Sequence, residues 1–250
     1  MRARFGLVDA LGDVNTYDAV RMQLVHARDM LRLCRSDNLG IRDLVPSLLL
    51  RLNRDQEECY DFIKWWCTTG QDPTYSWGNM NLGYLDLHNA NAFEPIAGLI
   101  HDFSDLGMMN VFALLKIKLL LDLVALNNST DVSTFQVIPR EVFDAVRPHL
   151  PRSPIITQDK AMLERDDHTA EIHNLEEQVR QLYSHIHKQN PYCWRLLLYP
   201  GSFLEKDEKP GMFSPGSFEE AQIMLGHSDD AWAETPGARA IIKAKYDGRY

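Results

Sequence analysis

The chain contains nine histidines, the residues whose side chains most readily bind metals or move protons near neutral pH. His185 and His187 are two residues apart, and on a helix such residues point to different sides. His168 and His173 are five apart and also miss a common face. Neither pair matches H-E-x-x-H, in which two imidazoles one helical turn apart bind zinc. The histidine spacing therefore predicts no metal site.

Two carboxylate–imidazole neighbours could act as acid–base pairs: Asp86 with His88, and His101 with Asp102. Such pairs arise often by chance, and a solvated or hydrogen-bonded histidine is their usual outcome. The sequence contains no G-x-S-x-G, P-loop or G-x-G-x-x-G motif, so it lacks the usual motifs of serine hydrolases and of nucleotide- and dinucleotide-binding proteins. We expect no catalytic residue, metal or cofactor. The alternative is an enzyme or metal-dependent protein with a site formed by residues 71–102.

Four arginines could instead bind an anionic partner. Arg28, Arg32 and Arg35 are spaced by four and three residues on a predicted helix, which places them along one face, and Arg42 follows in the next predicted helix. The planar guanidinium group suits carboxylates and phosphorylated side chains. For any single arginine a solvated face is the simpler interpretation, so the hypothesis depends on the patch as a whole.

A long segment, residues 71–95, contains aromatic residues, Asn and Gly but no helical stripe, which predicts an irregular loop. A loop of this length is uncommon in a compact domain unless it binds something or forms a lid. Tyr75, Trp77 and Tyr84 are its candidate binding residues. The simpler alternative is that these three rings cover the ends of neighbouring helices.

The formal net charge of the 250 residues is −9, but it is distributed unevenly. Residues 1–54 contain nine Arg and six Asp and therefore carry +3, which leaves −12 on the remainder. An acidic chain of this kind argues against general binding to nucleic acids or anionic membranes. The N-terminal region is the place where an acidic or phosphorylated peptide partner is expected.

The stretch from Asp29 to Trp66 carries the most consistent structural signals in the chain. An amphipathic helix is predicted over residues 16–34, a second over 41–52, and a third ends near Trp66. Pro46 requires either a kink in the second helix or a start near Asp43. The short connections between these helices predict antiparallel pairs.

Within this stretch, LNRDQEEC at residues 52–59 resembles the turn of a tetratricopeptide-type helix pair, L-G-R-x-E-E-A, with one extra residue. Ser47 and Cys59 then fall on the small packing positions of the two helices. The longer string at residues 31–66, with YLDL at 84–87 and DAWAETPGA at 230–238, resembles a poorly characterised fungal family. Some members of that family carry a MYND zinc finger. The resemblance implies a helical fold and a binding role.

The finger itself is absent, because four cysteines without a C-x-x-C pair cannot supply its ligands. Free cysteines on predicted core stripes and the lack of a signal peptide favour a reducing compartment. We therefore expect a cytoplasmic protein, with the nucleus as the alternative.

The most apolar segment, residues 104–126, is interrupted by Lys116, Lys118 and Asp122, and charges at mid-span are costly in a membrane. We predict that it is the central buried helix, in which Lys118 and Asp122 are one turn apart and can pair. Residues 1–15 show no clear periodicity and are expected to be a short lead-in.

The Pro-rich segment at 148–154 is the best candidate boundary, which divides the chain into 1–150 and 151–250. Beyond it, one helix is predicted from about residue 159 to 189, with an apolar seam that favours packing along the domain over dimerisation. Ser217 and Glu220 form a capping box that opens a C-terminal hairpin.

These patterns together predict an all-α fold of antiparallel helix pairs stacked as in a tetratricopeptide-like α-solenoid. Residues 1–150 would form the repeat core with its long loop, and residues 151–250 a long helix and a hairpin packed on that core. Leu48, Phe62 and Leu115 are expected in one continuous core. The function predicted is a non-catalytic scaffold for protein–protein interaction.

Overall fold

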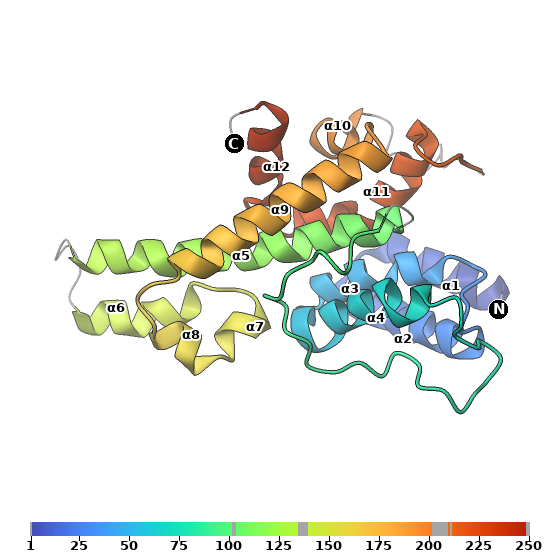
Figure 1. Ribbon diagram of the computed structural model, residues 1–250, viewed down its shortest axis with the longest axis horizontal. Coiled ribbons are helices and arrows are strands. Elements are labelled where there is room, and N and C mark those ends of the chain that lie inside the picture. The colour runs from blue at the N-terminus through green and yellow to red at the C-terminus, as the bar shows by residue number, and fades with distance from the viewer. Residues whose placement is uncertain (1, 102–103, 135–139, 202–209, 211, 249–250) are drawn as a thin grey trace.

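The computed structural model describes residues 2–101, 104–134, 140–201, 210 and 212–248. Every regular element in these ranges is a helix, and no strand occurs among them. The predicted all-α class is confirmed. The helices pack around one central helix, with the N-terminal helices on one side of it and the C-terminal helices on the other (Figure 1).

The predicted first amphipathic helix is confirmed as α2 (Tyr17–Leu33), and Thr16 caps it by accepting a hydrogen bond from the backbone N–H of Ala19 at 3.3 Å. The expectation of a lead-in before it is wrong, because residues 2–14 form α1 (Arg2–Val14). The Gln23 side chain of α2 donates to the Val8 carbonyl at 2.8 Å. Val8 is the one buried residue in α1, which explains why no inward stripe was visible in the sequence.

Capping residues define the ends of the next helices. The Asp37 carboxylate accepts hydrogen bonds from the Ile41 and Arg42 backbones, at 3.0 and 2.7 Å, and opens the short 3₁₀ helix η1 (Ile41–Asp43). Pro46 lies in the first turn of α3 (Val45–Arg51), where its missing N–H costs nothing. Asn53 ends this helix in the left-handed conformation, with φ of 54°.

After this turn the chain forms the π-helical η2 (Asp55–Tyr60), α4 (Asp61–Cys67) and the 3₁₀ helix η3 (Thr69–Gln71). From residue 72 to 105 the described residues form no helix. The predicted irregular loop is confirmed, and it extends ten residues beyond the expected end at residue 95. We call residues 72–101 the aromatic loop. It runs around the outside of α2–α4 and returns to the central helix (Figure 1).

The central helix is α5 (Leu106–Thr134), and every residue from Met108 to Leu120 is buried. A helix that is apolar on all sides has to be covered on all sides. The prediction of a buried central helix is confirmed. Its charged residues have partners from other elements: Lys118 donates to the Asn53 side chain at 3.0 Å, and Asp122 accepts from the Ser153 backbone at 2.7 Å.

The chain beyond α5 starts with small helices. They are α6 (Arg140–Val146), η4 (Arg147–His149), α7 (Pro154–Thr157) and α8 (Lys160–Glu164). The single helix predicted over 159–189 is wrong, because the chain breaks between α8 and α9 (Thr169–Gln189). The break is anchored by the His168 backbone N–H, which donates to Asn127 of α5 at 3.1 Å.

The predicted apolar seam of α9 is buried at Leu175, Val179, Leu182 and Ile186, and α9 packs along α5. Three further helices complete the fold: α10 (Cys193–Leu198), α11 (Phe218–Ala233) and α12 (Ala238–Tyr246). Ser217 caps α11 as predicted, by accepting from the Glu220 backbone at 3.2 Å. The last helix begins after Gly237, whose φ is 92°.

A buried polar residue fixes the register between α5 and α11. The Asn110 side-chain oxygen accepts hydrogen bonds from the Trp232 indole at 2.8 Å and from the Ser228 hydroxyl at 3.0 Å. Its amide group contacts the Cys193 sulfur at 3.6 Å. Sliding α11 by one turn would leave these buried groups unpaired, which is costly.

One hydrophobic core extends from Val8 to Ile242 and includes Leu48, Phe62 and Leu115, as predicted. This core contains residues from both predicted parts of the chain, on either side of the Pro-rich segment at 148–154. No helix among the described residues has the length and apolar character needed to cross a membrane.

Replacing Leu115 by Ala should lower the free energy of unfolding by about 2–5 kcal/mol, because the cavity left in a closely packed core stays largely unfilled. For a chain of this size each kcal/mol lowers the thermal midpoint by roughly 2–4 °C. Leu48→Ala and Phe62→Ala should behave similarly, and Leu39→Ala, at an exposed position, is the matched control. Unmoved midpoints in all three core variants would contradict the assigned core.

Lys116 gives a second test, based on pH. Its side chain is completely buried, donates to the Ala92 carbonyl and lies 5.2 Å from the ring centres of Tyr60 and Phe112. Burial lowers the pKa of Lys116 to about 7, although Glu94 opposes this effect. Between about pH 7 and 10 the unfolded chain therefore binds the proton that the folded chain releases, so stability from this residue rises with pH.

In Lys116→Met this contribution is removed. The free energy of unfolding of the variant minus that of the wild type should fall as pH rises from 7 to 10, with a slope approaching about 1.4 kcal/mol per pH unit. Chemical denaturation of both proteins across that range measures the difference. A difference that is independent of pH would show that the folded protein keeps Lys116 charged.

Candidate functional site

The wall of the candidate site begins at Asp61, the first residue of α4. Its side-chain oxygens accept hydrogen bonds from the Asn89 and Ala90 backbones, each at 2.8 Å. Burial raises the pKa of Asp61, while these two backbone donors oppose the shift. The carboxylate thereby holds the end of the loop segment 84–89 against α4.

A second anchor joins Asp86 to Trp65 in the middle of the same segment. The Trp65 indole N–H donates to the Asp86 carboxylate at 3.1 Å. Gly83 lies close beneath this contact: a Cβ added at Gly83 would be 1.9 Å from an Asp86 oxygen. A larger residue at Gly83 would therefore require the Asp86 carboxylate to move away from its present position.

Aromatic rings fill the space between the loop and α4. Trp65 makes edge-to-face contacts with Tyr75 and Tyr84, with ring centres 5.6 and 5.1 Å apart, and Trp77 stacks on Trp66 at 5.6 Å. Tyr75 and Trp77 thus pack the loop onto α4.

Arg35 attaches the other side of the loop to the end of α2. It donates to the carbonyls of Leu82 at 3.1 Å and Asn79 at 3.4 Å, and its guanidinium lies 5.1 Å from the centre of the Tyr84 ring. Arg42 lies 5.0 Å from the centre of a Trp66 ring, next to Asp105. Both arginines are therefore engaged within the fold.

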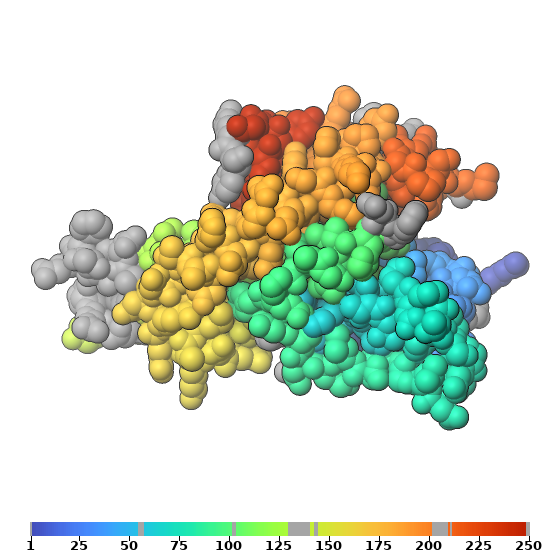
Figure 2. Space-filling view, in the orientation of Figure 1, coloured from blue at the N-terminus to red at the C-terminus, as the bar shows by residue number. Residues whose placement is uncertain are grey.

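Between these anchors lies a cavity of about 640 Å³. Arg28 and Arg32 of α2 form one side of it, and the loop forms the opposite side, which is visible as a continuous band below α5 in the space-filling view (Figure 2). We call this cavity the α2–loop groove. Its other lining residues are Glu58, Asp61, Phe62, Tyr84, Leu85, Leu87, His88 and Asn89.

The arginines of the groove form ion pairs with neighbouring carboxylates. Arg28 forms an ion pair with Glu58, which is also paired with Arg54 at 3.1 Å. Arg32 pairs with Asp29 at 3.1 Å, and its side chain is 71% exposed. Hydrogen bonds from Arg32 and Arg4 lower the pKa of Asp29, so this carboxylate is ionised near neutral pH. Exposed ion pairs of this kind contribute little to stability, so a ligand carboxylate can replace Asp29 at little cost.

Two loop residues in the groove adopt an unusual backbone conformation. Leu85 and Asn89 have positive φ angles of 51° and 58°. Asn tolerates this region well, whereas for Leu it is uncommon and strained. Such strain persists where the surroundings hold it in place, and it is enriched at binding and catalytic sites.

The structure brings together part of the predicted site. Arg28, Arg32 and Tyr84 line the groove, whereas Arg35, Arg42, Tyr75 and Trp77 hold the fold around it. The predicted face of Arg28, Arg32 and Arg35 is interrupted, because Arg35 turns to the loop carbonyls.

Sequence reasoning missed the apolar part of the groove. Phe62 was assigned to the core alone, and Leu85 and Leu87 received no role. The signal available in the sequence was that Leu85 and Leu87 are apolar residues next to Tyr84.

Asp86 and His88, one carboxylate–imidazole pair of the alternative hypothesis, have different surroundings. Asp86 is bound to Trp65, while His88 lines the groove. The His101 backbone donates to the Ser104 hydroxyl at 2.8 Å, and Asp102 lies outside the described residues. Among the described residues no group of three or more His, Cys, Asp or Glu side chains could hold a metal ion.

Comparison of this chain with protein-family models, with curated proteins and with solved structures finds no match in any of the three. The resemblance to tetratricopeptide pairs and to the fungal family stays a prediction. The geometry of the groove is therefore the basis for a functional proposal.

The Gly83 contact gives a direct test of the loop anchor. Gly83→Ala should displace Asp86 and leave the buried Trp65 indole unpaired, at a cost of about 1–3 kcal/mol. Tryptophan fluorescence should shift to longer wavelength as the loop loosens. Gly78→Ala is the control in the same loop, because a Cβ at Gly78 meets no atom within 4 Å. Equal behaviour of the two variants would contradict the anchor.

Proposed function

We propose that this chain is a non-catalytic binding module that holds an acidic or phosphorylated peptide segment of a partner protein in the α2–loop groove. The observation that carries the proposal is the composition of the groove, which opposes two arginines to an apolar wall of Phe62, Leu85 and Leu87. An acidic residue of a peptide would meet the arginines while a neighbouring apolar side chain enters the groove.

The charge arrangement supports an anionic ligand. The two carboxylates that line the groove already have partners: Asp61 accepts two backbone N–H groups, and Glu58 pairs with Arg28 and Arg54. Each guanidinium has five N–H donors, and Arg32 is largely exposed. An added carboxylate or phosphate therefore meets available donors on Arg32 first.

The dimensions and rigidity of the groove also support a ligand. Its volume of about 640 Å³ lies within the range of roughly 300–1,000 Å³ that is typical of ligand pockets. The loop is held on both sides, by Asp61 and by Arg35. A preformed wall loses little conformational freedom on binding, which favours affinity.

We also propose that α3 and the turn into η2 correspond to a tetratricopeptide-like pair. Ser47 and Cys59, the expected small positions, are both buried, and the Cys59 sulfur lies 3.6 Å from the Pro46 carbonyl. Stacked pairs of this kind create concave binding surfaces. The four free cysteines support a reducing compartment, cytoplasmic or nuclear.

The test is a selection of random displayed peptides on the wild-type chain, followed by affinity measurements on the selected peptide. We expect peptides rich in Asp or Glu with one apolar residue, and added salt should weaken their binding. Arg28→Glu combined with Arg32→Glu should reduce affinity at least about tenfold, because each lost charge-assisted hydrogen bond contributes about 1.5–3 kcal/mol.

Arg21→Glu is the matched control, since Arg21 is an exposed arginine of the same helix that pairs with Asp18 outside the groove. Circular dichroism checks that all variants keep their helix content. Unchanged affinity in the double variant, with helix content intact, would place the site elsewhere and leave the loop around Trp77 and Tyr84 as the next candidate.

A further inference from the structure

An apolar stripe runs along the exposed side of α1. Ala3, Leu7, Ala10 and Val14 are spaced by four, three and four residues, and all four are exposed, Leu7 by 41% and Val14 by 61%. This spacing is the one that forms the seam between two helices in a coiled coil. The described part of the chain leaves the stripe uncovered.

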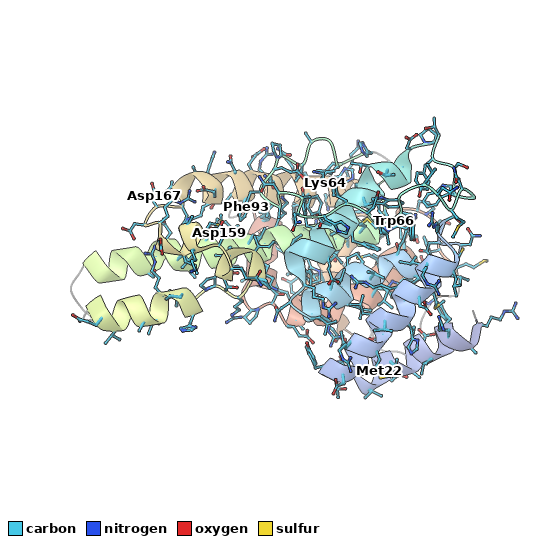
Figure 3. All side chains as sticks on the ribbon, turned by 90° about the horizontal axis from the view of Figure 1, so that it is seen from below. Met22, Lys64, Trp66, Phe93, Asp159 and Asp167 are labelled. Atoms are coloured by element: carbon cyan, nitrogen blue, oxygen red, sulfur yellow. The ribbon has the colours of Figure 1, made fainter. Side chains whose placement is uncertain are left out.

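The apolar surface continues onto α2. Met22, Val25 and Asp29 are spaced by three and four residues and share one side of that helix. Asp29 forms an ion pair with Arg4, so this side of α2 adjoins α1. Met22 and Val25 are 44% and 57% exposed, and Figure 3 places Met22 at the outer edge of the two helices.

The charges of α1 oppose its own dipole. Arg2 and Arg4 lie at the N-terminal end and Asp9 and Asp13 toward the C-terminal end, whereas the helix dipole favours the reverse order. An antiparallel neighbour with the same sequence would place its acidic half beside the basic end of α1. The charge order is therefore complementary to a second copy of the chain.

We propose that α1 pairs antiparallel with α1 of a second copy, around a two-fold axis that passes between Leu7 and Ala10. In this arrangement Leu7 faces the partner subunit's Ala10, and Ala3 faces the partner subunit's Val14. Each large side chain then meets a small one, which lets the two helices pack closely.

The length of α1 limits how strongly the two copies are expected to associate. A helix of 13 residues is about 20 Å long, so the seam alone is short. Met22 and Val25 widen the surface on the side of α2. We therefore expect an association that depends on protein concentration, and a monomer at high dilution.

Sedimentation equilibrium of the full chain over a range of concentrations tests the proposal. The wild type should approach twice the mass of one chain, and Leu7→Glu should weaken the association at least about tenfold by placing a charge in the apolar seam. Val146→Glu is the matched control, because Val146 is also exposed and lies on α6, at the opposite end of the molecule from α1 (Figure 1).

The register is tested by mixing two variants. Ala10→Lys alone should also weaken self-association, but a mixture of Leu7→Glu with Ala10→Lys should form a heterodimer, because the carboxylate introduced in one chain would face the ammonium group introduced in the other. Circular dichroism monitors the helix content of each variant. If Leu7→Glu loses helix, the self-association of Ala10→Lys is used to test the interface in its place. A wild type that stays monomeric, a dimer that neither change weakens, or a mixture that does not pair would each overturn the proposal.

Discussion

The structure depends on one constraint, the need to cover α5 on all sides. Every residue from Met108 to Leu120 is buried, so no face of this helix can be left to water. The covering elements come from both halves of the chain: α3 and η2 on one side, and α9, α11 and α12 on others. This shared task makes one core out of segments that are far apart in the sequence.

Part of the cover is irregular chain, and this has consequences for the groove. Loop backbone near a core needs hydrogen-bond partners, which helices supply internally and loops do not. Here side chains provide them: Lys116 and Gln178 donate to the carbonyls of Ala92 and Glu94, and Asp61 accepts from the backbone at 89–90. The same anchors that bury the return of the loop also hold the wall of the α2–loop groove in place.

Much of the fold could be predicted from the sequence, wherever a helix shows one apolar stripe and a capping residue. The helices α2 and α11 are of this kind, and for α9 the apolar seam was visible although no side chain caps its start. The pattern failed for α1, whose inward side offers Val8 alone, and at the break before α9, where the His168 backbone N–H donates to Asn127 of α5. Local periodicity carries no information about either case.

The candidate site was less predictable than the fold. Residue types led to Arg28, Arg32 and Tyr84, which line the groove, because exposed arginines and loop aromatics favour recognition. They also led to Arg42 and Trp77, which the fold uses to hold Trp66. The distinction depends on the path of the loop, and that path is set by contacts between Asp61 and backbone N–H groups 28 and 29 residues away.

The tryptophans give the molecule two separate optical reporters. All five belong to two clusters: Trp65, Trp66 and Trp77 beneath the aromatic loop, and Trp194 with Trp232 between α10 and α11. Ring pairs 5–7 Å apart in fixed orientations are the kind that couple electronically. The near-ultraviolet dichroism of the chain should therefore contain one contribution from each side of α5. Replacing Trp77 or Trp232 by Phe separates the two, so that loosening of the loop and unfolding of the C-terminal helices can be followed independently in a single protein.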